Sequence, residues 1–161
     1  MPRYQTIQPA TIDWQDNIPA SHDYGDIYFS RDSGIDETHY VFLDGNQLPQ
    51  RWLDKDSFTI AETGFGSGLN FLCTIDSWLK TALATARLHY ISVEKHPLTV
   101  KDLKRTLAQW PEYNAIGDEL LRAYPPAAHG LHRRDLFNGR ITLTLLFGDA
   151  VAMLEDINAS V

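Results

Sequence analysis

Two kinds of hydrophobic pattern divide the chain at about residue 58. Before that point, β-branched and aromatic side chains gather in two short runs, residues 26–30 and 38–43, joined by a polar stretch. This pattern predicts a β-hairpin. Beyond it, short apolar runs alternate with segments whose apolar residues recur every three or four positions. We therefore expect a β-rich N-terminal extension over 1–57 and an α/β part over 58–161.

The α/β part predicts three strands, over 58–62, 88–93 and 140–147. The first is followed by a helix with apolar residues Leu69, Leu72, Ile75 and Leu79, the second by a helix with the stripe Val100, Leu103, Leu107 and Trp110, and a short helix is expected over 112–123. Such alternation is typical of a parallel sheet. Because parallel sheets are normally larger and covered on both faces, we expect an incomplete Rossmann-like sheet in a truncated chain, which stops in the helix after the third strand.

A glycine-rich segment follows the first predicted strand: residues 61–70 read Ala-Glu-Thr-Gly-Phe-Gly-Ser-Gly-Leu-Asn. Glycines let the backbone approach a ligand closely, and the N-terminus of the following helix points its free N–H groups to the same place. A dinucleotide fingerprint needs its third glycine at position 69, which is Leu69. The spacing instead favours S-adenosylmethionine. An NAD-binding oxidoreductase remains the less favoured alternative.

An acidic residue follows or ends each of the three predicted strands, and these ends meet at the edge of the sheet where ligands bind. We expect Glu62 to meet the amino group of the methionine part, Glu94 to accept hydrogen bonds from the ribose hydroxyls, and Asp149 to reach the adenine amine. Tyr28 and Asn46 contact the ligand if the hairpin folds over this cleft, and otherwise serve in packing.

Composition and charge argue against several classes of function. The chain has 161 residues and a net charge of −7, with basic residues only in small groups, Lys101, Lys104 and Arg105, then Arg133 and Arg134. We interpret these groups as a solvated helix face and a polar loop, so this chain is a poor candidate for the main docking surface of a nucleic acid. No apolar run approaches the roughly 20 residues of a membrane span. One cysteine and six histidines without metal-ligand spacing predict no disulfide, no metal site and a cytoplasmic protein.

Several longer runs resemble one bacterial family. They are residues 26–30, 37–48, 62–71, 91–99 and 146–149, within a likeness that extends from about residue 4 to the end of the chain. The family is that of the bifunctional tRNA 5-methylaminomethyl-2-thiouridine biosynthesis proteins, and the similar part is their methyltransferase domain. The resemblance implies a class I methyltransferase fold and S-adenosylmethionine-dependent methylation of the 5-aminomethyl group of the tRNA wobble 2-thiouridine. It also implies tRNA and a C-terminal FAD-dependent oxidase domain as partners.

The resemblance also assigns site residues. Those matching the cofactor-binding portion of the family are Glu62, Gly64, Gly66, Gly68, Asn70, Glu94, Lys95 and Asp149, to which we add Phe65, Tyr28 and Asn46 as candidates. The family continues into a fourth strand and an Asp-Gly-Phe-Ala-Pro motif at the reaction centre, neither of which this chain contains. No catalytic residue is therefore assigned, and the alternative is a non-catalytic binding fragment that associates with itself through uncovered apolar surface.

Overall fold

The computed structural model describes residues 6–23, 28 and 34–159. The strands are β1 (Ile12–Gln15), β2 (Ile18–Ser21), β3 (Ser57–Thr63), β4 (Arg87–Glu94), β5 (Gly130–Leu136) and β6 (Ile141–Phe147). The α-helices are α1 (Gly34–Glu37), α2 (Leu69–Thr81), α3 (Val100–Leu107), α4 (Asn114–Ala123) and α5 (Ala150–Ala159). Shorter helical segments are η1 (Thr38–Leu43), η2 (Asp44–Asn46), η3 (Gln50–Trp52) and η4 (Pro111–Tyr113).

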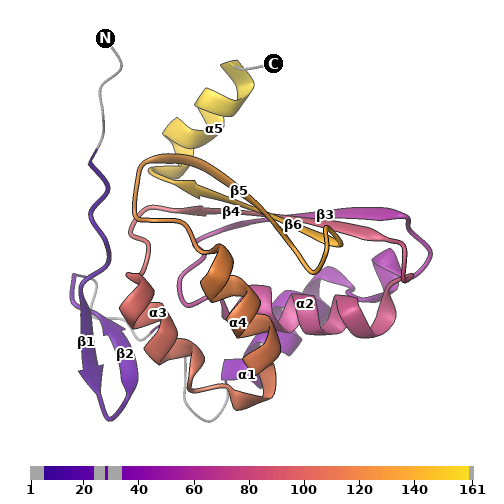
Figure 1. Cartoon of the computed structure of the whole chain (residues 1–161), viewed down its shortest axis with the longest axis horizontal. Coiled ribbons are helices and arrows are strands. Elements are labelled where there is room, and N and C mark those ends of the chain that lie inside the picture. The colour runs from indigo at the N-terminus through magenta and orange to yellow at the C-terminus, as the bar shows by residue number, and fades with distance from the viewer. Residues whose placement is uncertain (1–5, 24–27, 29–33, 160–161) are drawn as a thin grey trace.

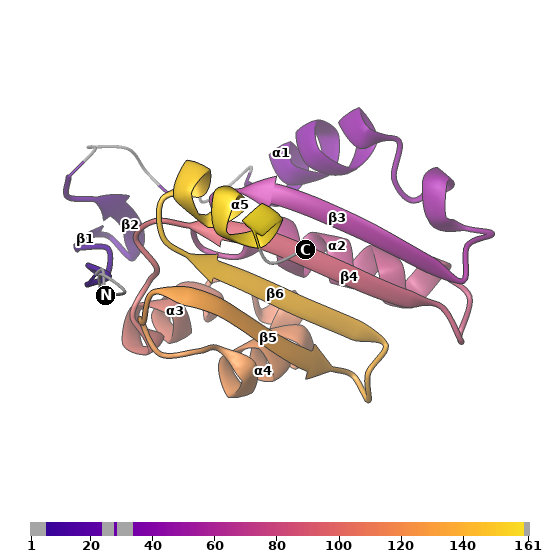
Figure 2. The same ribbon diagram turned by 90° about the horizontal axis from the view of Figure 1, so that it is seen from above.

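Four strands form the main sheet in the order β3-β4-β6-β5 (Figure 2). β4 pairs in parallel with both β3 and β6, which confirms the three predicted parallel strands. β5 runs antiparallel to β6 and was not predicted, because Arg133 and Arg134 were interpreted as part of a polar loop. The turn between β5 and β6 contains Asn138 and Gly139, both with positive φ.

The two faces of the sheet are covered differently. Figure 1 shows α2, α3 and α4 on one face, while α5 lies alone on the other. Strand residues alternate between the faces, so Leu88 and Tyr90 of β4 enter the core beneath the helices. α5 covers the end of the opposite face through Met153, which packs with Val93 and Leu146.

The predicted hairpin over 26–43 is wrong in its second half. Residues 38–43 form a π-helix rather than a strand, and most of the first run, residues 26, 27, 29 and 30, lies outside the described residues. In helical form, Thr38 and Leu43 are buried while Tyr40 is 76% exposed, so packing against α2 outweighs the β propensity of the segment. The hairpin observed is β1–β2, which turns at Asp16 and Asn17 with positive φ.

This β1–β2 hairpin is held against α3. The indole Nε1 of Trp14 donates to Asp102 Oδ1 at 3.2 Å, and the Arg105 guanidinium lies 4.0 Å from the centre of the Trp14 ring. Arg105 also donates to Asn17 Oδ1 at 2.9 Å. Arg105 contacts the hairpin but stays exposed, as do Lys101 and Lys104, so the basic group of α3 lies on a solvated helix face as predicted.

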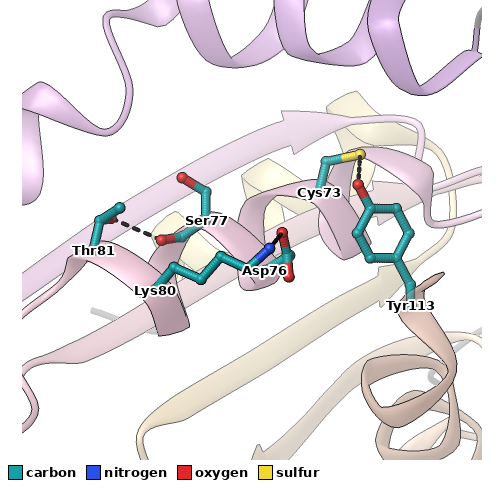
Figure 3. A network of polar contacts seen from close by, with 6 residues as sticks. All are labelled: Cys73, Asp76, Ser77, Lys80, Thr81 and Tyr113. Atoms are coloured by element: carbon teal, nitrogen blue, oxygen red, sulfur yellow. Dashed lines mark hydrogen bonds and ion pairs between the residues drawn. The ribbon is translucent and has the colours of Figure 1, made fainter.

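The single cysteine lies inside the helical layer. Cys73 of α2 is fully buried, and its thiol donates to the Tyr113 hydroxyl at 3.5 Å, which links α2 to η4 (Figure 3). On the outer side of the same helix, Lys80 pairs with Asp76 at 2.7 Å (Figure 3). Within the described part of the chain, no helix has the length and apolar character needed to cross a membrane. Nor do the described histidine, cysteine and acidic residues form a group of three that could hold a metal ion.

Candidate cofactor site

The glycine-rich loop leaves β3 and turns directly into α2. Gly64 donates its N–H to the Val93 carbonyl at 2.7 Å, which ties the start of the loop to β4. Gly66 and Gly68 have φ of +54° and +79°, a region that other residues rarely adopt. A Cβ on Gly68 would lie 3.2 Å from the Phe65 ring. The local backbone therefore requires glycine at both positions.

Glu94 at the end of β4 fixes the middle of this loop. Its Oε2 accepts the Gly66 N–H at 2.8 Å, and its Oε1 accepts the His96 N–H at 2.8 Å. Each carboxylate oxygen has two lone pairs, so both can still accept a hydrogen bond from a ligand hydroxyl. The side chain thus combines loop positioning with the acceptors that a ribose needs.

Glu62, near the end of β3, is held by polar side chains of α2 and β4. Its two carboxylate oxygens accept hydrogen bonds from Asn70 Nδ2 at 3.2 Å and from Ser92 Oγ at 3.0 Å. Burial raises the pKa of Glu62 to about 7; nearby Glu94 raises it further, whereas the hydrogen bonds oppose the shift. Glu62 is therefore an acid that changes charge near neutral pH.

Asp149 and Lys95 lie together beyond the ends of β4 and β6. Lys95 Nζ is 3.5 Å from Asp149 Oδ2, and both side chains are at least half exposed. Asp149 Oδ1 also accepts the Val151 N–H at 3.1 Å at the start of α5, and hydrogen bonds from the backbone there lower the pKa of Asp149. With residues 6–8, this pair lines a pocket of about 190 Å³.

A larger cleft of about 300 Å³ is lined by the glycine loop. One wall is formed by the loop itself and by Asn70 of α2. Further lining residues come from α1 and η1 and include Glu37, Thr38 and Phe42. Tyr28 closes one side, with its ring atom Cδ1 3.6 Å from where a Cβ on Gly66 would lie. The glycine loop thus borders this cleft, whereas the pocket beside Asp149 is lined by other residues.

The structure brings most of the candidate residues to this loop, but places two of them differently. Phe65 lines the cleft, but its side chain is only 3% exposed and packs against Phe71 and Tyr124, so most of its ring is in the core. Asn46 donates to the Phe42 carbonyl at 2.7 Å and lines a separate small pocket beside β3. The α1–η1 wall was missed, because its sequence was interpreted as a strand.

These features define a class of protein. A parallel β–α–β unit with a glycine-rich loop and an acid at the end of the second strand is the cofactor-binding arrangement of Rossmann-like domains. Among solved structures, the chain is similar to MNMC2 from Aquifex aeolicus, with a TM-score of 0.68 at 22% identity over 92% of this chain and 46% of that one. This likeness shows the Rossmann-like fold.

Several curated proteins are similar to the chain over most of its length. No protein-family model matches the chain. Proteins named tRNA 5-methylaminomethyl-2-thiouridine biosynthesis bifunctional protein MnmC match it from Marinomonas sp., at 46% identity over 98% of this chain, and from Methylobacillus flagellatus, at 47% over 93%. The chain spans about a quarter (24%) of the length of these relatives. It is homologous, over nearly all of its own length, to a part of the MnmC proteins, and the resemblance inferred from the sequence is confirmed.

Proposed function

We propose that this chain is the S-adenosylmethionine-binding part of a class I methyltransferase that methylates the 5-aminomethyl group of the tRNA wobble 2-thiouridine. The observation that carries the proposal is the Glu94 carboxylate clamped to Gly66, at 2.8 Å, at the edge of an open cleft. The substrate is supported by relatives at about 46% identity that are named for the biosynthesis of this modified uridine. With tRNA as the substrate, we also propose a cytoplasmic location.

The residues around the loop fit such a cofactor. We assign the adenine amine to Asp149, the ribose hydroxyls to Glu94 and the amino-acid part to the cleft beside Asn70, supported by the position of these groups around the glycine loop. Gly66 leaves room beneath the Tyr28 ring that a side chain would fill. When bound, S-adenosylmethionine supplies a methyl group on a positively charged sulfur, which a neutral amine attacks in line.

In this chemistry the protein contributes positioning and electrostatics. We assign the glycine loop to holding one end of the cofactor, since Gly64 and Gly66 donate hydrogen bonds to Val93 and Glu94 of β4. The acceptor amine must be neutral when it attacks, because an ammonium group has no free lone pair. Removal from water lowers the pKa of such an amine. We assign no residue of this chain to the proton transfer.

Calorimetric titration of the chain with S-adenosylmethionine and, in parallel, with NADH tests the cofactor. We expect saturable binding of S-adenosylmethionine only. Gly66→Arg should abolish it, because the new side chain enters the cleft under Tyr28. Gly45→Arg, at an exposed position outside the cleft, is the matched control and should bind normally. Tight NADH binding, or no S-adenosylmethionine binding by the folded chain, contradicts the proposal.

The methylation step needs a separate experiment. The chain is extended by the sequence that follows the matched segment in the Marinomonas relative and supplied with labelled S-adenosylmethionine. We expect label to enter tRNA that carries the 5-aminomethyl group, but not tRNA that is already methylated there. Cofactor binding without any transfer by this extended chain would favour the alternative, a binding fragment with no methyltransferase activity.

A further inference from the structure

The pocket beside the Lys95–Asp149 pair is built from segments that are far apart in the sequence. Part of its lining follows the sheet strands: Lys95 and His96 come after β4, and Gly148 and Asp149 come after β6. The rest of the lining is formed by residues 6–8, which precede the β1–β2 hairpin. The N-terminal extension therefore contributes directly to this pocket of about 190 Å³.

This N-terminal segment is held along the connection between β4 and α3. The ring Nδ1 of His96 donates to the Gln8 carbonyl at 3.2 Å, and the Ala10 N–H donates to the Pro97 carbonyl at 3.0 Å. The β1–β2 hairpin that follows lies beside α3 (Figure 1) and is hydrogen-bonded to it. Contacts thus occur in the same order along both segments, and they fix residues 6–8 at the pocket.

His96 also connects this pocket to Glu94, which we assign to the ribose. The His96 N–H donates to Glu94 Oε1 at 2.8 Å, while the ring of the same residue contacts Gln8. The N-terminal segment is therefore one residue removed from the carboxylate that holds the glycine loop. A ligand whose ribose meets Glu94 has its base within reach of this segment.

The pocket has a polar side and one hydrocarbon side chain. Among its described lining residues, only Ile7 has a side chain made entirely of hydrocarbon. Ile7 is half-buried and packs against the main core, so its position is fixed while part of its surface stays open. A purine ring has polar edges and apolar faces. Its amine edge can meet a carboxylate such as Asp149, whereas its faces need an apolar contact.

We propose that residues 6–8 form the outer wall of the adenine pocket and that Ile7 packs against a face of the purine ring. This assignment rests on the proposed function and deepens it, because it adds to the cofactor site a segment in which the sequence indicated no candidate residue. Removing the apolar contact from water stabilises the bound cofactor. The hairpin then serves the site by holding this wall in place.

Nuclear Overhauser effects between protein and ligand test the contact directly. The chain is prepared with isotope-labelled isoleucine methyl groups and saturated with S-adenosylhomocysteine, the demethylated form of the cofactor. The signal that is missing in Ile7→Ala identifies the Ile7 methyl group. We expect Overhauser effects from this methyl group to the purine ring protons. Their absence in the saturated complex overturns the assignment.

Binding affinity gives a second test. In calorimetric titrations, Ile7→Ala should weaken S-adenosylhomocysteine binding about fivefold, on the order of the effect of one to two buried CH₂ groups. Ile12→Ala is the matched control, because Ile12 of β1 is also half-buried against the main core but does not line the pocket. This control should bind within twofold of the unsubstituted chain.

The outcomes separate this assignment from the proposed function. Unchanged binding in Ile7→Ala overturns the assignment alone. Equal weakening in Ile7→Ala and Ile12→Ala also overturns it, since the effect would then follow the loss of core packing that both variants share. If the folded, unsubstituted chain does not bind S-adenosylhomocysteine at all, the proposed function fails together with the assignment.

Discussion

Glu62 is the residue whose environment departs most from that of a carboxyl group in water. Burial raises its pKa from 4.5 to about 7, so the folded chain holds a proton that the unfolded chain releases between these values. Because the unfolded state binds fewer protons there, this residue makes the protein less stable as pH rises from about 4.5 to 7. The penalty is complete above about pH 7 and amounts to at most roughly 3 kcal/mol.

Glu62→Gln should remove this pH dependence. Relative to the unsubstituted chain, the variant should gain up to roughly 3 kcal/mol more in its free energy of unfolding at pH 8 than at pH 5. The substitution therefore stabilises the folded state more at pH 8. Urea titrations of both proteins at these two pH values measure it. Glu155→Gln, at an exposed position on α5, is the control and should show no such change. A constant difference between Glu62→Gln and the unsubstituted chain would show that Glu62 titrates as an ordinary carboxyl.

Cys73 offers a second prediction at the scale of one residue. The thiol is fully buried, and burial raises its pKa to about 11, so almost none of the reactive thiolate is present at pH 8. A thiol-specific reagent should leave the folded chain unmodified over minutes and label it rapidly in denaturing urea. Rapid labelling without denaturant would mean that the contact between α2 and η4 opens readily.

At the scale of elements, local patterns predicted the segments whose two faces differ in polarity. α2, α4, β3, β4 and β6 lie close to their predicted positions, because each has an apolar side that enters the core. β5 was missed, although Asn138 and Gly139 form a strong hairpin signal, since its residues are mostly polar and only Leu136 is fully buried. Residues 38–43 were misassigned because their conformation is decided by α2, which is distant in sequence.

The candidate site likewise contains residues that the sequence predicted and residues that it did not. The glycine loop and Glu94 follow from spacing along one β–α–β unit, and the structure brings them within hydrogen-bonding distance. The α1–η1 part of the cleft lining could not be found from spacing, because it depends on the helical conformation of a segment that was predicted as a strand. Asn46 was grouped with the site on the expectation that a hairpin covers the cleft, whereas the structure places it in the pocket beside β3.

The β1–β2 hairpin supplies a prediction at this scale, because one residue provides much of its contact with α3. Trp14→Ala removes both the indole hydrogen bond to Asp102 and the stacking of Arg105. We expect a loss of about 1–2 kcal/mol in the free energy of unfolding. Amide hydrogen exchange should rise in β1 and β2 far more than in β4. Trp14→Phe, which keeps a ring beneath Arg105 but loses the indole donor, should lose about half as much stability.

At the scale of the whole molecule, the two faces of the main sheet are covered unevenly by helices. Three helices shield one face, whereas α5 shields only the end of the other (Figure 1). On this second face Leu131 of β5 is 56% exposed, and on α5 Val151 and Leu154 are 66% and 50% exposed. Within the described residues, β3 pairs with a strand on one side only. Exposed apolar surface beside an unpaired strand edge favours association between copies.

We therefore expect the 161-residue chain to associate with itself as its concentration rises, through β3 and the face that carries Leu131. Sedimentation equilibrium between micromolar and submillimolar concentrations measures this. Thr59→Lys places a charge on the exposed face of β3 and should weaken association several-fold, as charged edge residues do. Thr85→Lys, the same substitution in an exposed loop, controls for net charge and should have little effect. If all three chains remain monomeric throughout, the net charge of −7 outweighs the apolar surface; if Thr85→Lys weakens association equally, the contact lies away from β3.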